Sequence, residues 1–404
     1  MNNRIKIELV EAINKTKSKA EIFLMPTIYN KEFGWLYTAT HDPIKFPSAI
    51  LYGTWSGILG LNLLKITDNW LQSTKDELVS LLNSYRLADG TFLPKMLIHG
   101  KTNKSQEYLK LHCTNYSLGA IIELNPEFDF ESPYLNRFLN PDFLKYWLEG
   151  RSLLRPWEEG NNIVNVCSYL ALLNDNGHPT AKERLYQLLD WHNRVQNPIT
   201  GGFDNFSSPG YRQHLESLAG AVHNFHLHLY LKEPLGSEEL ISNWMTKFLP
   251  QGRLSACLSL DFVELAVRTL PFSQDPQKVV NALLFHAEHL FKSQRFDGGW
   301  PENEFDTPTQ AEGFKDDKVS SCSYATWFRL CSLGMIAIVL LGDDSNNWGF
   351  RKTLGMGYAP SYWPQLPKNV LIRDLSISEK FAYKINSFKR NFNSNLIKFG
   401  SKFL

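Results

Sequence analysis

The 404-residue chain has little excess charge of either sign, no paired cysteine motif and no long apolar run. Its 42 basic and 41 acidic side chains leave a net charge of +1, which gives no electrostatic pull toward nucleic acid. The five cysteines include no Cys-x-x-Cys pair, and the N-terminus has no apolar signal-peptide core, so we expect a reduced, cytoplasmic protein. The longest apolar run, residues 335–341, is too short to span a bilayer.

Strand signals are also scarce, whereas apolar residues recur at helical spacing along most of the chain. The apolar fraction of 43% and the aromatic fraction of 13% allow a sizeable core. Helices are predicted at residues 5–22, 50–64, 69–85, 109–124, 139–150, 160–173, 180–196, 214–231, 237–249, 258–269, 276–294 and 320–341. The sequence therefore predicts an all-α protein built from helical hairpins.

Glycine-rich turns separate these hairpins. The clearest is QRFDGGWPE at residues 294–302, where glycine permits a positive φ and Gln294 can hydrogen-bond exposed backbone at a helix end. Weaker copies stand at residues 196–204 and 86–92. The turns fall at steps of about 50 residues or twice that, a period typical of stacked supersecondary units. A closed ring of alternating outer and inner helices gives every hairpin two neighbours and leaves a central cavity.

These turns resemble the QW repeat of squalene and terpenoid cyclases and the Gly-Gly-Phe/Trp repeat of protein prenyltransferase β subunits. The resemblance covers about residues 50–345 and implies an α/α toroid of about six hairpins. We expect an N-terminal cap at residues 1–49, the toroid at 50–345, a rim loop at 346–378 and a separate C-terminal helix at 379–404.

The catalytic motifs of these families are absent. No Asp-x-Asp-Asp is present, and DDSNN at residues 343–347 lacks the last carboxylate of Asp-Asp-x-x-Asp. Cys322 follows Asp317, but the spacing of the prenyltransferase zinc ligands is different and no matching histidine is found. No catalytic residue carries over from the resemblance. No cofactor is predicted, and Mg²⁺ is expected only if the substrate is a diphosphate.

One cluster of candidate residues precedes the helix at 160–173, and its side chains should sit at a mouth of the ring. A helix N-terminus stabilises carboxylates, which is a sufficient structural reason for the acids here. Beside an indole they could instead act as a general acid or base with a raised pKa. The cluster comprises Trp157, Glu158, Glu159, Asn161 and Asn162.

Histidines and a buried acid give two further groups. His214 and His223 lie on a helix that lacks a His-Glu-x-x-His zinc motif, so polar packing or an acid–base role near the cavity is expected rather than a metal site. Asp261, one turn from Cys257, would be costly inside an apolar helix unless paired, for example with Arg268. A loop of acids that includes Glu302, Asp306, Glu312 and Asp317 is either solvated or contacts a ligand.

Three functions fit these observations. The first is an enzyme that acts on an isoprenoid or similar apolar substrate, with Asp261, Glu158 or Glu159 as acid and His223 as a further catalytic group. The second is a glycan-active lyase, hydrolase or epimerase in cell-surface polysaccharide metabolism, and the third is a scaffold without catalysis. A pocket of Phe, Trp and Leu favours isoprenoid, whereas carboxylates with stacked aromatic rings favour glycan. Residues expected to bind the substrate are Trp157, Asn161, Asn162, His112, His214, Trp300 and Trp327.

The C-terminal residues 379–404 have a different composition. Phenylalanine, isoleucine and leucine recur there at steps of three and four, and lysine and arginine surround them with a single acid, Glu379. A basic amphipathic helix can lie on an anionic membrane surface, or it can dock on protein. The protein is therefore expected to be cytoplasmic, with peripheral membrane binding as an alternative.

Overall fold

The computed structural model describes residues 3–98, 104–251, 254–303, 310–311, 314–316, 318–358, 360 and 362–373. Almost all regular structure in these residues is helical, as the sequence predicts. The longer helices are α1 (Asn3–Ile22), α2 (Ser48–Leu63), α3 (Gln72–Asn83), α5 (Gln106–Leu124), α7 (Pro141–Glu149), α8 (Pro156–Asp175), α9 (Ala181–Val195), α10 (Tyr211–Leu231), α11 (Glu238–Phe248), α12 (Ala256–Thr269), α13 (Pro276–Ser293) and α14 (Ser323–Ile336). Short helical segments are α4 (Lys95–Ile98) and α6 (Pro133–Asn136).

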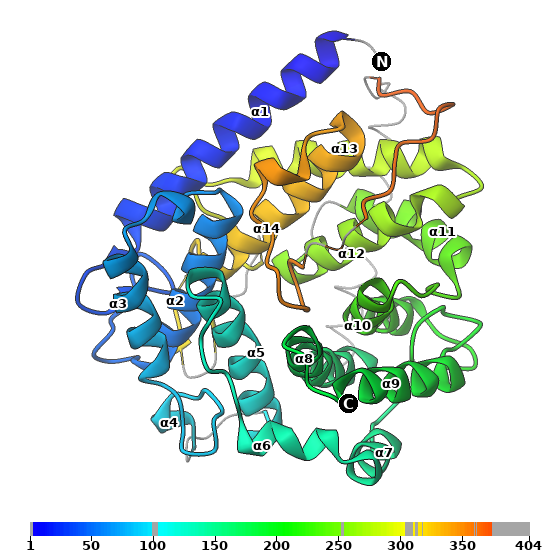
Figure 1. Ribbon diagram of the computed structural model, residues 1–404. Coiled ribbons are helices and arrows are strands. Elements are labelled where there is room, and N and C mark those ends of the chain that lie inside the picture. Colours follow the sequence, from blue (N-terminus) through cyan, green and yellow to red (C-terminus); the bar gives the residue numbers. More distant parts are fainter. Residues whose placement is uncertain are drawn as a thin grey trace, which may run out of the picture.

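The helices form an α/α toroid (Figure 1). The inner ring runs α2, α5, α8, α10, α12 and α14, and each of these helices packs on the next, with α14 returning to α2. The outer helices lie outside this ring, so that α9 packs on α8, α11 on α12, and α13 on α14. The predicted fold class is confirmed, because alternating helices close around a common axis.

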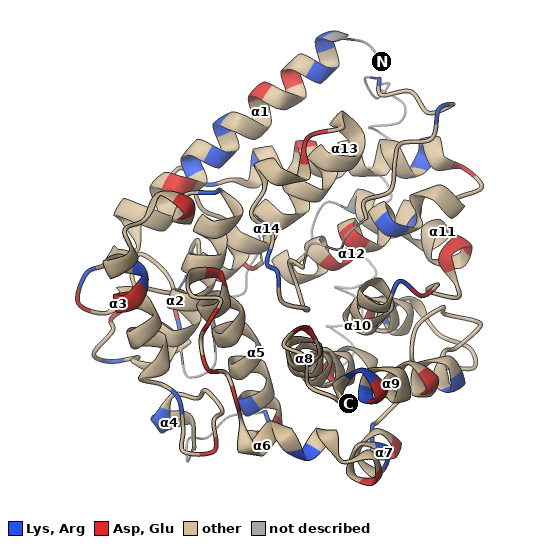
Figure 2. Ribbon diagram, viewed as in Figure 1, with Lys and Arg blue, Asp and Glu red and all other residues tan. Residues whose placement is uncertain are grey.

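Burial explains which helices lie inside. Every residue of α2 is buried, and α5, α8 and α14 are buried along most of their length. Helices such as α3 and α7 bury only one face, which is the pattern of an outer layer. Charged side chains accordingly lie along α1 and the outer helices, whereas α12 is an inner helix that carries acids (Figure 2).

The inner helix that begins at α14 continues to Leu341 through one π-helical segment, Ala337–Leu341. This stretch, Ser323–Leu341, is 19 residues long and apolar enough by length and composition to cross a membrane, although the shorter run 335–341 is not. Of its most apolar window, 94% is buried inside the protein. Its apolarity is therefore accounted for by its place in the core.

The glycine-rich turns join successive hairpins. Gly298 has a φ of +92°, and Nε2 of Gln294 donates hydrogen bonds to the backbone oxygens of Gly298 and Thr16, at 2.8 and 3.0 Å. Gln196 repeats the arrangement with the backbone oxygens of Gly201 and Leu235, at 3.1 and 2.7 Å. In each turn the glutamine amide thus donates one hydrogen bond within its own turn and one to the backbone of a neighbouring segment: α1 for Gln294, and the loop before α11 for Gln196.

The C-terminal end of the inner ring is filled by the chain itself. The segment after α14 enters the ring, and Arg351, which is 2% exposed, donates from Nη2 to Oδ1 of Asn115 at 2.8 Å. A Cβ added to Gly119 would meet this guanidinium, so glycine makes room for it. This segment therefore occupies the end of the ring at which the inner helices finish.

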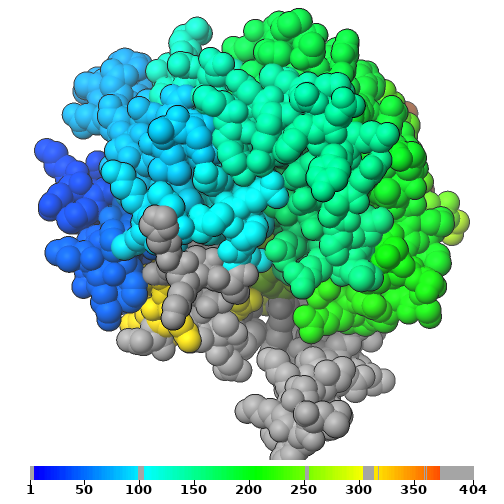
Figure 3. All heavy atoms as spheres, turned by 90° about the horizontal axis from the view of Figure 1, so that it is seen from below, coloured from blue at the N-terminus to red at the C-terminus, as the bar shows by residue number. Residues whose placement is uncertain are grey.

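Residues before α2 pack against the ring, where α1 contacts α13 and α14. Two short antiparallel pairs, β1 (Tyr29–Asn30) with β2 (Gly34–Trp35) and β3 (Gln310–Ala311) with β4 (Phe314–Lys315), are the sheets of the described residues. The space-filling view from below shows the continuous outer surface made by the chain around α4 to α7 (Figure 3). The predicted helix at 379–404, together with Asp306, Glu312 and Asp317, lies outside the described residues.

Candidate functional site

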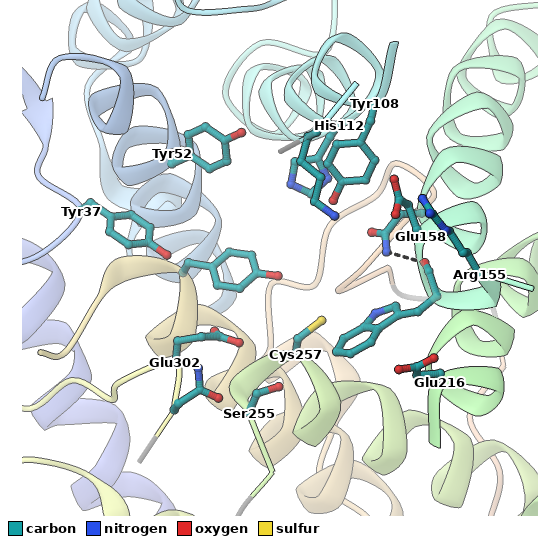
Figure 4. A pocket seen from close by; sticks show the side chains of 15 residues that line it. Tyr37, Tyr52, Tyr108, His112, Arg155, Glu158, Glu216, Ser255, Cys257 and Glu302 are labelled. Atoms are coloured by element: carbon teal, nitrogen blue, oxygen red, sulfur yellow. Dashed lines mark hydrogen bonds between the residues drawn. The ribbon is translucent and has the colours of Figure 1, made fainter. Parts of the chain in front are cut away.

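A pocket of about 630 Å³ opens at one end of the ring. Its walls come from the first two turns of all the inner helices and from the loops before α2 and α14 (Figure 4). The described lining residues are Tyr37, Tyr52, Lys104, Tyr108, His112, Arg155, Trp157, Glu158, Asn161, Glu216, Ser255, Cys257, Glu302, Asn303 and Tyr324. Each of them carries a nitrogen, oxygen or sulfur atom in its side chain, and none is aliphatic.

The polarity of this pocket follows from helix direction. Tyr52, Glu216 and Tyr324 belong to the first two turns of α2, α10 and α14, so the N-termini of the inner helices meet at the same end. Helix N-termini expose unpaired N–H groups and a partial positive charge. Carboxylates and polar ligand groups are therefore stabilised at this end of the toroid, whereas the apolar side chains are deeper in the ring.

The first two turns of α8 supply one wall. Trp157, Glu158 and Asn161 line the pocket, and Arg155 lies just before the helix. Nδ2 of Asn161 donates to the backbone oxygen of Trp157 at 2.9 Å, which fixes the orientation of the amide. Of the five residues in the predicted cluster, three therefore line the pocket.

Helix α5 supplies the neighbouring wall. The imidazole of His112 is stacked on Tyr108, with ring centroids 5.3 Å apart and planes 15° apart. Burial, reinforced by the positive charge of Lys104, lowers the pKa of His112 to about 3. The ring is thus neutral at physiological pH, and its Nδ1 has no hydrogen-bond partner within the described protein.

Glu302 lies at the N-terminus of α12, on the side of the pocket away from α8 (Figure 4). Its backbone oxygen accepts from the N–H of Ala256 at 2.8 Å, which fixes the loop on the helix start. Burial raises the pKa of Glu302 to about 6, although Arg329 and hydrogen bonds from Ser255 and the Cys257 N–H favour the carboxylate. Glu302 can therefore exchange a proton near neutral pH.

Cys257 separates the pocket from Asp261. Sγ of Cys257 lies 3.9 Å from Oδ2 of Asp261, whose side chain is completely buried and whose Oδ1 has no hydrogen-bond partner. Burial, with the nearby charges of Glu264 and Glu302, raises the pKa of Asp261 well above its usual value. Arg268, which the sequence suggests as its ion partner, instead lies near Glu264, with Nη2 of Arg268 3.8 Å from Oε1 of Glu264.

Glu159 and Asn162 lie on the side of α8 that faces its neighbours. Glu159 pairs with Arg151 at 3.2 Å and accepts from the backbone N–H of Ser152, also at 3.2 Å. Nδ2 of Asn162 donates to Glu159 at 3.1 Å. Neither residue is among those that line the pocket, and both have contacts that stabilise the start of α8.

The other predicted site residues are buried away from the pocket lining. His223 has no hydrogen-bond partner on either ring nitrogen, and burial together with His226 and His112 lowers its pKa to about 3. The ring of His214 lies 4.0 Å from that of Trp244. Trp300 donates from Nε1 to the backbone oxygen of Leu290 at 2.9 Å, and Trp327 packs edge-on to Trp55 in the ring core.

Several lining residues had no sequence signal of their own. The tyrosines of the pocket come from positions as far apart as Tyr37 and Tyr324, and only ring closure brings them together. A usable signal would have been the position of each polar residue relative to the start of an inner helix. That rule selects Tyr52, Tyr108 and Glu216 as well as the α8 cluster.

No metal site is found in the part of the chain that the structure describes. Within it, no group of three or more His, Cys, Asp or Glu side chains is arranged to hold a metal ion. The described lining of the pocket offers carboxyl, hydroxyl, amide, thiol and imidazole groups beside two cations, Lys104 and Arg155.

Comparisons with known proteins give a match in structure alone. No protein-family model matches the chain, and no curated protein sequence matches it. Among solved structures, the chain is similar to a variant of the type II terpene cyclase MstE from Scytonema in complex with the product merosterolic acid A. The TM-score is 0.47 and the sequence identity 14%, over 83% of this chain and 99% of the cyclase chain.

Proposed function

We propose that the protein is a glycan-active enzyme whose pocket at the N-terminal end of the ring binds a saccharide. The observation that supports this most is the lining, in which every described side chain carries a polar atom and none is aliphatic. A saccharide presents hydroxyl groups in many directions and can pair with such a wall. An isoprenoid chain would take these polar groups out of water and offer them no hydrogen bonds, which is unfavourable.

The aromatic residues of the pocket suit the faces of sugar rings. Trp157 and Tyr52 lie on different inner helices, and the neutral imidazole of His112, on α5, contacts the rings of Tyr52 from α2 and Tyr108 from α5. Stacking on such rings binds the apolar face of a sugar, while the amide of Asn161 and the cation of Arg155 reach its polar edge. The reacting unit is held between α5, α8 and α12.

The acid–base step that fits best is cleavage of a glycosidic bond by water. Glu302 gives its proton to the glycosidic oxygen as the bond from that oxygen to the anomeric carbon breaks. Glu158, from the opposite wall, takes a proton from the water whose oxygen bonds to the anomeric carbon. One carboxyl loses a proton and one gains a proton, so the step balances. Burial at the start of α12 maintains a share of protonated Glu302 near pH 6.

A hydrolysis assay tests this function. The enzyme is incubated with a panel of oligosaccharides, and new reducing ends are measured. Wild type is expected to release them from at least one glycan class, and Glu302→Gln and Glu158→Gln each to lower kcat by about 10²–10⁴-fold. Glu127→Gln, on an exposed turn after α5, is the matched control with unchanged rate. Release of reducing ends at the wild-type rate by Glu302→Gln would reject the assignment.

A second candidate is acid-initiated chemistry on an isoprenoid or similar apolar substrate. It is favoured by Asp261, a fully buried carboxyl that is held protonated and has an unpaired Oδ1 behind the pocket wall. Aromatic rings such as Tyr324 would then face a cationic intermediate. If the substrate carried a diphosphate, Mg²⁺ would accompany it. Conversion of an isoprenyl substrate by wild type but not by Asp261→Asn would establish this candidate over the first.

We also propose that residues 379–404 hold this cytoplasmic enzyme on an anionic membrane surface. The support is the sequence stripe of apolar residues surrounded by lysine and arginine. Flotation with vesicles that contain about 30% anionic lipid should recover the full chain and not a chain that ends at residue 373. Equal flotation of both, or of neither, would leave protein docking as the role of the tail.

A further inference from the structure

A second hollow, of about 470 Å³, lies on the outside of the toroid at the C-terminal end of α7. We call it the α7 groove, and it is lined by Phe143, Tyr146, Trp147, Glu149, Gly150 and Arg151. Tyr146 is 80% exposed, so one aromatic side chain presents its ring to solvent. Aromatic rings beside a carboxylate and a guanidinium are the same kinds of groups that line the central pocket.

Arg151 joins this groove to the central pocket. Its guanidinium lies 4.2 Å from the ring centre of Trp147, and Nη1 contacts Glu159 at 3.2 Å and Glu107 at 3.7 Å. Those two acids are the sequence neighbours of Glu158 and Tyr108, which line the central pocket. Through Arg151, the wall of the groove therefore contacts acids that are adjacent in sequence to residues of the central pocket.

The chain itself limits how far apart the hollows are. Gly150 and Arg151 line the groove, and Arg155 lines the pocket. Four residues of extended chain reach at most about 14 Å from Arg151 to Arg155. A short oligosaccharide spans such a distance, so one ligand can occupy both hollows.

We propose that the α7 groove is an outer subsite for further saccharide units of the glycan whose reacting unit occupies the central pocket. The inference rests on the proposed function, and it adds that the enzyme acts on oligosaccharides or polysaccharides rather than on monosaccharides. Units that leave the pocket pass the start of α8 and stack on Tyr146, where Glu149 and Arg151 offer acceptors and donors to hydroxyl groups.

Chain-length dependence of binding tests the inference. Affinity is measured by calorimetry for a series from disaccharide to octasaccharide of the glycan class that the enzyme binds. Wild type should bind the longer members more tightly, and Tyr146→Ala should weaken their binding by about tenfold with disaccharide binding unchanged. Tyr146→Phe, which keeps the ring, should retain most of the gain. Phe296→Ala, at a fully exposed ring on the turn before α14, is the control.

The outcomes separate the two proposals. If wild type binds short and long saccharides equally, or if Tyr146→Ala binds the long ones as wild type does, the outer subsite is wrong and the central saccharide site stands. If Tyr146→Ala weakens disaccharides as much as octasaccharides, the effect is not that of a subsite. If wild type binds no saccharide of any length, the proposed function and the subsite both fall.

Discussion

Gln294 and Thr16 close the ring, because Nε2 of Gln294 donates to the backbone oxygen of Thr16 at 3.0 Å. Gln294 ends α13 in the last hairpin, and Thr16 belongs to α1, before the first inner helix. The same amide also donates to Gly298 in its own turn. A residue singled out for its place in a repeat thus joins the two ends of the toroid.

The first prediction concerns this amide. Gln294→Ala leaves two backbone oxygens without their donor, and the expected loss is about 1–3 kcal/mol in the free energy of unfolding. Urea denaturation of the whole chain measures it. Gln72→Ala, which removes only an exposed contact with Asp76, should change stability by less than about 0.5 kcal/mol. Equal effects of the two substitutions would contradict a ring-closing role.

Much of the fold could be predicted because helix periodicity and turn chemistry are local properties. The expected helix at 180–196 is α9, Ala181–Val195, and the expected turn at Gly298 has the positive φ that only glycine adopts cheaply. The structure also explains why arginine can stand in place of glutamine in the degenerate repeat at 86–92. Arg86 replaces glutamine there and donates to the backbone oxygens of Asp129 and Glu131, at 3.0 and 2.5 Å.

The site was less predictable, because it depends on which residues meet across the ring. Trp157 and Glu158 could be predicted to lie at a mouth of the ring because they stand at the start of a helix, and both line the pocket in the structure. Whether Glu302 is a solvated loop acid or a buried one depends on contacts with α12 that are distant in sequence. Trp300 is expected from the sequence to bind the substrate, yet it is fully buried in its own turn.

The second prediction is a pH dependence set by Glu302. Its pKa is raised to about 6, so the protonated acid is present below that pH and lost above it. Glycan hydrolysis should therefore fall about tenfold per pH unit above about pH 6. A pH profile of kcat/KM measures this limb, which should be missing from the residual activity of Glu302→Gln. An unchanged limb in that variant would assign it to another group.

The third prediction separates the two candidate functions at Asp261. Because its folded pKa is raised, wild type gains stability from the protonated carboxyl at low pH and loses it as pH rises through the folded pKa. Asp261→Asn removes this loss, so its stability relative to wild type should increase from pH 4.5 to pH 7.5 in urea unfolding. Glycan hydrolysis should be retained in the variant. Loss of glycan hydrolysis with intact stability would contradict this prediction, and conversion of an isoprenyl substrate by wild type but not by the variant would favour the acid-initiated candidate.

The fourth prediction concerns the buried charges of α10 and α12. Oε2 of Glu264 lies 3.0 Å from Nε2 of His226, and Oε1 lies 3.8 Å from Arg268, with all three side chains buried. Glu264→Ala leaves Arg268 without this counter-charge, and the expected loss of stability is about 3–5 kcal/mol. Chemical denaturation measures it. Glu288→Ala, which removes a surface pair with Lys292, should cost less than about 1 kcal/mol.

The central claim is that the pocket at the N-terminal end of the ring takes a saccharide, and thermal unfolding with added ligand tests it most directly. The full chain is heated with oligosaccharides or with isoprenyl diphosphates, in wild type and in Trp157→Ala. A ligand at 100 times its Kd adds about 2.7 kcal/mol of stability, which raises Tm. We predict a rise in wild type with saccharides, lost in Trp157→Ala; a rise with isoprenyl diphosphates alone would contradict the account.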